Sequence, residues 1–319
     1  NREHPEEPFF LWIHYWDPHD PILTPPEELL PEGLPRYQGK PRKSDLLYAA
    51  ELKFLDAQFG RLLDHLDVQG LADQTIVAAT ADHGEGLTDG VLRHAWGFHR
   101  ILYKEQIHVP LLMRGPGLGE PGAVVEGAVG CVDIAPTLFE LCDVAPPADL
   151  EGQSLVSAAR GGPLEPRAIY ADQINGYDLN AKMLQNRPKA DFLYTLVETD
   201  WKIIYRPNFP ADSELYDLRS DPLEEKNVWA EHPDQVVRLL TLLAERDGWV
   251  TEPFSGGEVP TPEALAILAK LGYTGGAGEE EIASTWGWIC PTADLENATI
   301  HQDRGGCEES GVRMIPIRK

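Results

Sequence analysis

Hydrophobic positions along the first 120 residues form runs that predict buried strands. Mainly apolar runs occupy residues 9–15, 75–81 and 109–114, and uninterrupted runs of this length are typical of strands buried on both faces. Between the first two runs, apolar residues recur at helical spacing over residues 47–66, and Gly70 ends the pattern. This order of elements predicts an α/β fold with a mostly parallel central sheet flanked by helices.

The pattern changes in the second half of the chain. Short apolar stretches at residues 168–171, 192–197 and 201–205 are separated by turns, which is typical of antiparallel strands. Residues 236–243 and 262–270 have helical spacing, so we expect helices that pack with a smaller antiparallel sheet. The regions we expect are the later part of an α/β catalytic domain, a smaller α+β subdomain and an irregular tail, over residues 1–160, 161–275 and 276–319.

The first predicted strand has too few partners within the chain. A doubly wound sheet usually has about five or more strands, and the first 120 residues supply only three strong candidates. A buried parallel strand needs a hydrogen-bonded neighbour on each side. The pattern therefore indicates that the chain begins in the middle of a larger sheet.

The composition is ordinary for a globular protein except for its charge. There are 27 Lys and Arg residues against 52 Asp and Glu residues, which gives a net charge of −25. So large an acidic excess argues against nucleic acid or an anionic membrane as a partner, because both are bound through clustered Lys and Arg. No apolar run approaches the ~18 residues that are needed to span a bilayer.

The four cysteines fall into two pairs with different expectations. Cys131 and Cys142 flank an apolar stretch, so we expect them to be buried as small hydrophobic residues. Cys290 and Cys307 lie in a Gly-rich polar tail. A disulfide between them and two free thiols are both open, and a disulfide would imply an oxidising compartment.

Two of the predicted strands deliver carboxylate and imidazole groups to one edge of the sheet. The second strand is followed directly by Asp82 and His83 and then by glycine, which lets the backbone turn. This pairing suits a divalent cation, although such a pair also serves simply to cap a loop. The first strand carries His14 and is followed by His19, and His14 is either a site residue or a core histidine. Because ligand sites lie beyond the carboxyl ends of strands in open α/β sheets, this edge is the candidate site.

A cluster of cationic side chains stands out in an acidic chain. Four of eight consecutive residues are cationic or can become so, namely Arg93, His94, His99 and Arg100. Such a cluster can bind an anionic group and donate a proton to a leaving oxygen. The alternative is a solvated loop with Trp96 and Phe98 turned inward.

Together these stretches resemble the sulfatase family of the alkaline-phosphatase-like superfamily. The resemblance spans about residues 9–273, and the ordered series of motifs is far more specific than any one of them. The matching stretches are residues 9–21, 48–77, 81–85, 102–117, 132–138, 214–224 and 271–273.

The resemblance implies roles for five residues. Asp82 and His83 correspond to ligands of a calcium or magnesium ion, with His83 in place of the Asn of many members. His19 corresponds to a residue that contacts the sulfate. His99 falls where the family usually has a Lys that binds the sulfate and the bridging oxygen; an imidazolium there can donate a proton to the leaving group, with a pH dependence near ~6.5. His94 corresponds to a histidine that is common beside that loop.

The chain lacks two N-terminal signatures of the family. It contains neither two consecutive aspartates for the metal nor a Cys/Ser-x-Pro-x-Arg motif, whose first residue becomes the formylglycine nucleophile. We therefore expect the C-terminal part of a sulfatase, which is inactive by itself. The front half would lie on a separate chain or be lost.

Three functions are open at this point. The resemblance favours a sulfuric ester hydrolase that acts on a small-molecule or glycan sulfate ester. The second is a phosphodiesterase or phosphonate monoester hydrolase of the same superfamily, and the third is a non-catalytic binding or scaffold protein. Family members commonly act outside the cytoplasm, so the resemblance favours a periplasmic or extracellular location.

Overall fold

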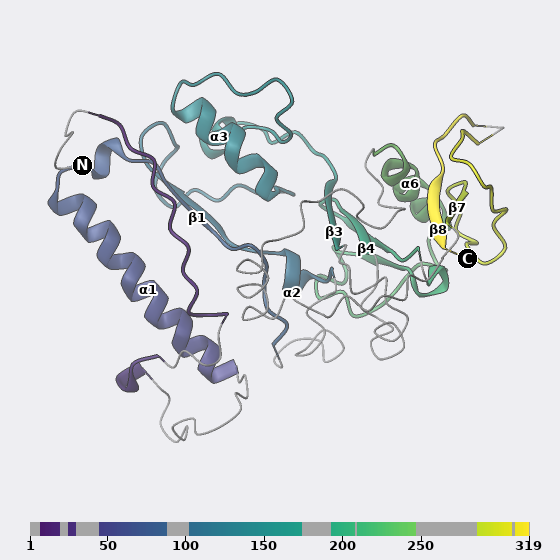
Figure 1. Cartoon of the computed structure of the whole chain (residues 1–319), viewed down its shortest axis with the longest axis horizontal. Helices are drawn as coiled ribbons and strands as arrows, with labels where there is room; N and C mark the ends of the chain where they lie inside the picture. Colours follow the sequence, from purple (N-terminus) through teal and green to yellow (C-terminus); the bar gives the residue numbers. More distant parts are fainter. Residues whose placement is uncertain are drawn as a thin grey trace, which may run out of the picture.

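The computed structural model describes residues 7–19, 25–29, 45–87, 102–173, 193–207, 209–246, 286–307 and 310–318. The helices are α1 (Asp45–Val68), α2 (Lys104–Ile107), α3 (Ile134–Leu141), α4 (Val156–Ala159) and α6 (Pro233–Ala244). The strands are β1 (Val77–Thr80), β2 (Leu111–Arg114), β3 (Ile169–Gln173), β4 (Leu193–Val197), β5 (Trp201–Tyr205), β6 (Glu214–Asp217), β7 (Trp286–Ile289) and β8 (Ile315–Arg318). Short 3-10 helices cover Glu27–Leu29, Ala72–Gln74, Cys131–Asp133 and Pro210–Asp212. In Figure 1, α1 lies at one end of the molecule and the pair β7–β8 at the other.

The long helix α1 confirms the helix predicted over residues 47–66. It ends at Val68, and two residues later Gly70 has a φ of +68°, a left-handed conformation that favours glycine. The backbone N–H of Leu71 donates to Leu66 O, and that of Gly70 donates to Asp67 O. These two hydrogen bonds form a Schellman C-cap, so the predicted stop at Gly70 has a specific backbone cause.

Strands β1 and β2 confirm that two of the apolar runs form strands, but they pair antiparallel and neither is buried on both faces, since Leu112 is 64% exposed. Val77 lies opposite Arg114, and Thr80 lies opposite Leu111. The predicted parallel sheet is not confirmed, because every strand pair in the described residues is antiparallel. An apolar run indicates that a strand is buried but does not encode the direction in which it pairs.

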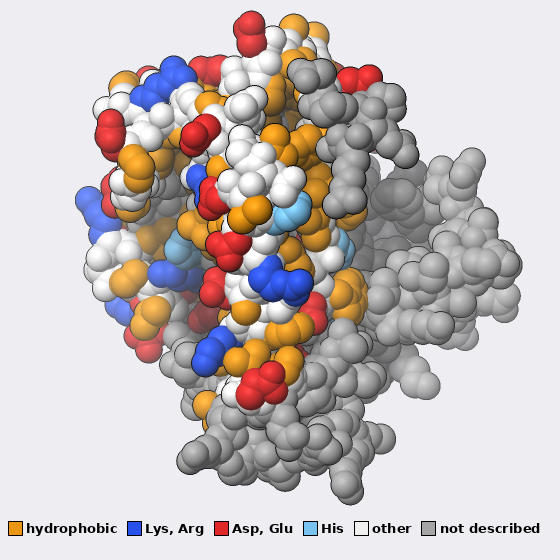
Figure 2. All heavy atoms as spheres, turned by 90° about the vertical axis from the view of Figure 1, so that its left-hand side faces the viewer, with side chains coloured by type: hydrophobic (Ala, Val, Ile, Leu, Met, Phe, Trp, Pro, Cys, Tyr) orange, Lys and Arg blue, Asp and Glu red, His pale blue; other side chains and the backbone are white. Residues whose placement is uncertain are grey.

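The apolar run at residues 9–15 does not form the predicted buried strand. It has no regular secondary structure, and the side chains of Phe10 and Trp12 are 86% and 76% exposed. Rings follow one another along this segment at centroid distances of 5.8, 5.4 and 4.4 Å, namely those of Trp12, His14, Trp16 and His19. Figure 2 shows the face at this end of the molecule, where hydrophobic side chains (orange) reach the surface.

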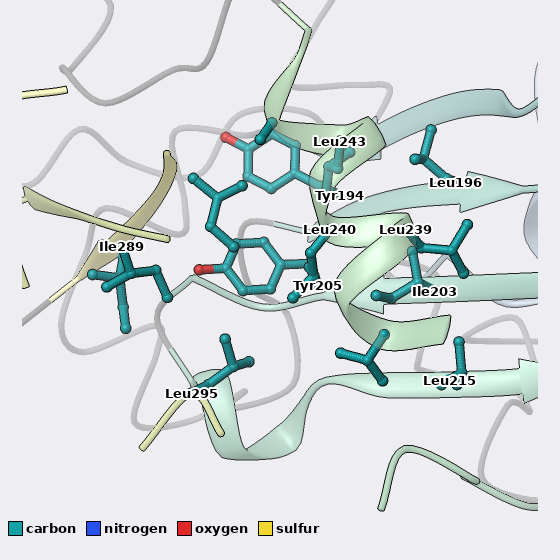
Figure 3. Close-up of a cluster of buried hydrophobic side chains, with 14 of the residues drawn as sticks. Tyr194, Leu196, Ile203, Tyr205, Leu215, Leu239, Leu240, Leu243, Ile289 and Leu295 are labelled. Atoms are coloured by element: carbon teal, nitrogen blue, oxygen red, sulfur yellow. The ribbon is translucent and has the colours of Figure 1, made fainter. Parts of the chain in front are cut away.

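The smaller antiparallel sheet with its helix is confirmed. Strands β3, β4, β5 and β6 pair in that order, and α6 packs on β4 and β5. Strand β6 is an addition to the strands that the sequence pattern predicts. The buried side chains between sheet and helix include Tyr194, Leu196, Ile203, Tyr205, Leu215, Leu239, Leu240 and Leu243 (Figure 3). Complete burial of such a side chain contributes roughly 1.5–3 kcal/mol relative to exposure.

The tail, which we expected to be irregular, forms two strands and joins the same core. Ile289 of β7 and Ile315 of β8 have no exposed surface and lie in that core. The Tyr205 hydroxyl donates to Pro316 O at 2.6 Å. Two strands of four residues are too short to give a recognisable period in the sequence. Cys290 and Cys307 form a disulfide, which decides between the two alternatives that the sequence left open.

Cys131 and Cys142 are free and exposed, so the prediction that they are buried is wrong. They lie at the two ends of the apolar stretch, and the fully buried positions between them belong to Asp133 and Thr137. The Thr137 hydroxyl donates to Asp133 O at 2.6 Å and accepts from the N–H of Leu155 at 2.9 Å. This segment is therefore organised around buried polar groups rather than around the two thiols.

Two further predictions are not tested by the structure. The helix expected at residues 262–270 lies outside the described residues. The boundaries near residues 160 and 275 stay predictions. Across the described ranges, no helix combines the length and the apolar character needed to cross a membrane.

Candidate active site

The candidate site lies directly after β1, where the chain turns at Asp82 and His83. The backbone N–H of His83 donates to Asp82 Oδ1 at 3.0 Å, and His83 Nδ1 lies 2.8 Å from Gly84 O. Because a carbonyl oxygen only accepts, Nδ1 carries a proton in this contact, and Nε2 is the ring nitrogen left to bind a cation. His83 Nε2 lies 3.9 Å from Asp82 Oδ2. One nitrogen and one oxygen donor are therefore close enough to contact one cation.

This pair fits part of a divalent-metal site. Metal-binding imidazoles commonly donate their second N–H to a backbone carbonyl, as His83 does to Gly84 O. The side chains of Asp82 and His83 are 74% and 45% exposed, so both are open to a ligand. Among the residues that the structure describes, no group of three or more His, Cys, Asp or Glu could hold a metal ion. The described residues thus offer two ligands, and further ligands would come from outside them.

Gly84 brings the backbone of the candidate site into close contact with α2. Its backbone N–H donates to Gln106 O at 2.7 Å. A Cβ at this position would lie only 2.0 Å from Glu105 O, so no residue with a side chain fits without moving the backbone. The location of the Asp82–His83 turn is therefore set by the location of α2.

The other predicted site residues are not tested by the structure. His19 ends a turn in which its N–H donates to Trp16 O at 3.0 Å, and its ring packs on that of Trp16. His94 and His99 lie outside the described residues. The roles of these three histidines therefore stay predictions.

A buried polar cluster beside α2 was missed by the sequence analysis. Lys202 Nζ lies 2.8 Å from each carboxylate oxygen of Glu224, and the two side chains are only 1% and 3% exposed. The Tyr103 hydroxyl donates to Glu214, with Oε1 and Oε2 at 2.8 and 2.7 Å. A lone Lys or Glu in a sequence carries no sign of burial, and the nearest signal is that both glutamates lie in one resembling motif.

The carboxylates of this cluster oppose the effect of burial on the pKa of Lys202. Burial lowers the pKa of Lys202 below its usual range, while Glu224, Glu105 and Glu214 act in the opposite direction. A buried ammonium that is held between carboxylates in this way is costly to leave without a partner.

The resembling motif at residues 132–138 has a structural role. Asp133 is fully buried and accepts from the N–H of Gly130 at 2.8 Å and from that of Gln153 at 2.9 Å. It also pairs with Arg167. One carboxylate thus ties together three loops near α3.

Comparison with known families identifies the class of protein. A family model described as "Sulfatase" matches residues 1–144, and a model described as "N-sulphoglucosamine sulphohydrolase, C-terminal" matches residues 93–246. With the turn after β1, these matches define a hydrolase fold of the alkaline-phosphatase-like type. Within that class, residues 1–246 of this chain match models of the sulfatase family. Residues 247–319 lie outside both matches.

Individual relatives agree with this placement. N-acetylglucosamine-6-O-sulfatase from Bacteroides thetaiotaomicron is 30% identical over 204 residues, which cover 62% of this chain and 34% of the relative. A structure solved in complex with its substrate D-glucosamine-2-N,6-O-disulfate is 29% identical with a TM-score of 0.53, and covers 62% of this chain and 39% of that one. Phosphonate monoester hydrolase from Silicibacter pomeroyi is 28% identical with a TM-score of 0.50, and the shares are again 62% and 39%. The chain spans about a third to a half of the length of the sulfatase relatives it matches.

Proposed function

We propose that this chain is the later part of a sulfuric ester hydrolase. The observation that carries the proposal is the Asp82–His83 turn, in which Nε2 of His83 lies 3.9 Å from a carboxylate oxygen and Nδ1 lies 2.8 Å from Gly84 O. This turn follows a strand and lies within the residues that the sulfatase model matches.

Each candidate residue has one task in this proposal. Asp82 and His83 hold a calcium or magnesium ion, which supplies positive charge to the sulfate oxygens when it is bound. His19 donates a hydrogen bond to the sulfate. His99, as an imidazolium, contacts the bridging oxygen and donates a proton to the departing alcohol. His94 adds a substrate contact beside His99.

The nucleophile comes from polypeptide outside these 319 residues. The formylglycine motif is not in the chain, and the chain spans 34% of the Bacteroides relative. The exposed apolar segment from Phe9 to Ile13 supports this proposal, because all five side chains are at least 42% exposed although their composition is that of a buried strand. In this proposal the nucleophile-bearing polypeptide covers that segment, either in the same chain or as a separate one.

The substrate class is a sulfate ester of a sugar or of another small molecule. The Bacteroides relative is a sulfatase of N-acetylglucosamine, and the structure with D-glucosamine-2-N,6-O-disulfate binds a sulfated amino sugar. The net charge of −25 makes a local source of positive charge necessary for any anionic substrate. The metal, His94 and His99 supply it in this proposal.

The disulfide supports a location outside the reducing cytoplasm. Disulfides such as Cys290–Cys307 form and persist in oxidising compartments. The periplasm or the extracellular space fits this requirement.

The test compares the 319-residue chain with protein purified from the native host through an antibody against this chain. We expect calcium-dependent hydrolysis of p-nitrophenyl sulfate only in the host preparation, and mass spectrometry should find a formylglycine there. Full turnover by the 319-residue chain alone would contradict the assignment of the nucleophile. Asp82→Ala in the host should abolish activity, whereas Asp73→Ala, at an exposed aspartate, should not. Full activity of Asp82→Ala would remove the metal assignment.

A phosphonate monoester hydrolase is the second candidate function. The match to the Silicibacter enzyme favours it, since identity and coverage are nearly those of the sulfated-sugar complex. The host preparation should be assayed with p-nitrophenyl phenylphosphonate beside p-nitrophenyl sulfate. The larger kcat/KM identifies the native reaction, and we expect the sulfate ester to give it.

A further inference from the structure

The buried cluster beside α2 connects the C-terminal sheet to the candidate metal-binding turn. Its members are Tyr103, Lys202, Arg206, Glu214 and Glu224. Lys202 and Glu214 belong to β5 and β6, Arg206 directly follows β5, and Glu224 lies in the turn after β6. Tyr103 immediately precedes α2.

Glu224 holds the first residue of α2 from another part of the chain. Its Oε2 accepts from the backbone N–H of Lys104 at 3.1 Å, a donor that has no partner within the helix itself. The same carboxylate binds Lys202 Nζ through both oxygens. The Lys104 ammonium also donates to Pro222 O at 3.1 Å, so the turn around Glu224 contacts Lys104 twice.

The backbone of Glu224 adopts a conformation that is unusual for a residue with a side chain. Its φ is +58°, in the left-handed region where glycine or asparagine is favoured and most other residues are strained. The turn is held by Asp221, which accepts from the N–H groups of Glu224, Glu225 and Lys226. From this turn the buried carboxylate of Glu224 reaches Lys202 and the N–H of Lys104.

Glu214 holds the neighbouring residue in the same way. It accepts from the Tyr103 hydroxyl, and Arg206 lies 3.8 Å from its Oε2. The Tyr103 ring packs edge-on against Tyr216 of β6 at 6.4 Å. Two carboxylates of the C-terminal part therefore fix two consecutive residues, 103 and 104.

From α2 the connection continues to the candidate metal ligands. Gln106 O accepts from the N–H of Gly84, and the backbone of Gly84 lies so close to α2 that a Cβ there would be 2.0 Å from Glu105 O. Gly84 directly follows Asp82 and His83 in the chain.

We infer that Glu224, paired with Lys202, is a positioning residue that fixes α2 and, through α2, the Asp82–His83 turn. That this turn binds a metal rests on the proposed function, whereas the effect of Glu224 on the position of the turn does not. Outer-shell groups of this kind affect metal binding although they never touch the ion.

The test is hydrogen–deuterium exchange of the full 319-residue chain without metal, followed by mass spectrometry. Glu224→Gln keeps the size of the side chain but removes its charge. We expect the amides of residues 82–86 and 104–108 to exchange about tenfold faster, because a hydrogen bond to a charged group is lost. Glu225→Gln is the matched control, since Glu225 is adjacent and exposed, and it should leave both segments unchanged.

A second variant covers the case in which Glu224→Gln unfolds the chain. In Lys202→Met combined with Glu224→Leu, apolar side chains replace the buried pair and should restore the sheet. The acceptor for the Lys104 N–H is still missing, so we expect slow exchange in β4 and β5 but fast exchange at residues 82–86. Unchanged exchange at residues 82–86 in a folded variant would overturn the inference. Equal acceleration in β4, β5 and the turn in both variants would also overturn it.

Calcium titration separates this inference from the proposed function. We expect Glu224→Gln to weaken calcium binding about tenfold, as mutations outside the first ligand shell do, and Glu225→Gln to leave it unchanged. If Asp82→Asn leaves calcium binding as in the wild type, the metal assignment is wrong. The exchange experiment then still decides whether Glu224 positions the turn.

Discussion

The two parts of this molecule bury their apolar residues to very different extents. In the C-terminal part, Ile203 and Leu239 have no exposed surface and belong to one core between sheet and helix. In the N-terminal part, Phe10, Trp12 and Leu112 are 86%, 76% and 64% exposed. Apolar residues of the same kinds thus form a core in one part and an open surface in the other.

This difference shows that the strand-like composition of a segment does not reveal whether the residues that would cover it lie in the same polypeptide. The C-terminal part contains both sides of its core, because α6, β4, β5 and the pair β7–β8 meet in it. The N-terminal part presents one side, and an exposed apolar surface of this kind is typical of an interaction site. The two parts should therefore respond differently to the same kind of mutation.

The largest effect is expected at the buried ion pair of the C-terminal part. Lys202→Met leaves Glu224 buried without its partner, and we expect the free energy of unfolding in urea to fall by about 3–5 kcal/mol. Lys226→Met is the control, because Lys226 pairs with Glu231 at the surface and should change stability by less than about 1 kcal/mol. Equal effects of the two substitutions would contradict the description of Lys202 as buried and paired.

Truncation of one apolar side chain in each part tests the comparison directly. Leu239→Ala removes a fully buried side chain and should lower the free energy of unfolding by about 2–5 kcal/mol. Phe10→Ala removes an exposed one and should change it by no more than about 0.5 kcal/mol. Both are measured by urea denaturation of the 319-residue chain. If Phe10→Ala is as costly as Leu239→Ala, the apolar segment is already covered within this chain.

The disulfide provides a further test of the difference between the two parts. Replacing Cys290 and Cys307 by serine should lower stability by about 3 kcal/mol, because the bond closes a loop whose ends are 17 residues apart. Replacing the exposed Cys131 and Cys142 by serine should have little effect. A thiol reagent should modify two cysteines per native chain without reduction. Modification of four would show that the disulfide is absent.

The smallest effects concern glycines near the N-terminal helix and the candidate site. Gly84→Ala brings a Cβ to 2.0 Å from Glu105 O and should cost about 1–3 kcal/mol of unfolding free energy. Gly60→Ala meets nothing within 4 Å inside α1 and should stabilise the chain by about 0.5–1 kcal/mol. Thermal unfolding distinguishes the opposite signs. A stabilising Gly84→Ala would show that the turn is not pressed against α2.

The regular elements with a clear period could be predicted from the sequence. Helices α1 and α6 show apolar residues at helical spacing, and β4 and β5 are short apolar runs between turns. Each of these signals depends on neighbouring residues alone. Strand pairing depends on distant residues, and for this reason the direction of the β1–β2 pair could not be predicted.

The candidate site also contains one pair of residues that the sequence predicts and another that it does not. The proximity of Asp82 and His83 follows from their adjacency, so the sequence alone predicted it. The pairing of Lys202 with Glu224 depends on residues 22 positions apart, and nothing in either local sequence indicates it. His94 and His99 lie outside the described residues, so the part of the site that they represent is still a sequence prediction.

The contribution of β8 to the core has a consequence for synthesis on the ribosome. Tyr205 and its hydrogen-bond partner Pro316 are 111 residues apart in the chain. At about 5–20 residues per second, β5 leaves the ribosome several seconds to roughly twenty seconds before β8 does. During that interval the apolar face that Ile315 and Ile317 later cover is open to solvent. The sheet therefore exposes this apolar face during the synthesis of every molecule, and until β8 docks the nascent chain is prone to aggregation.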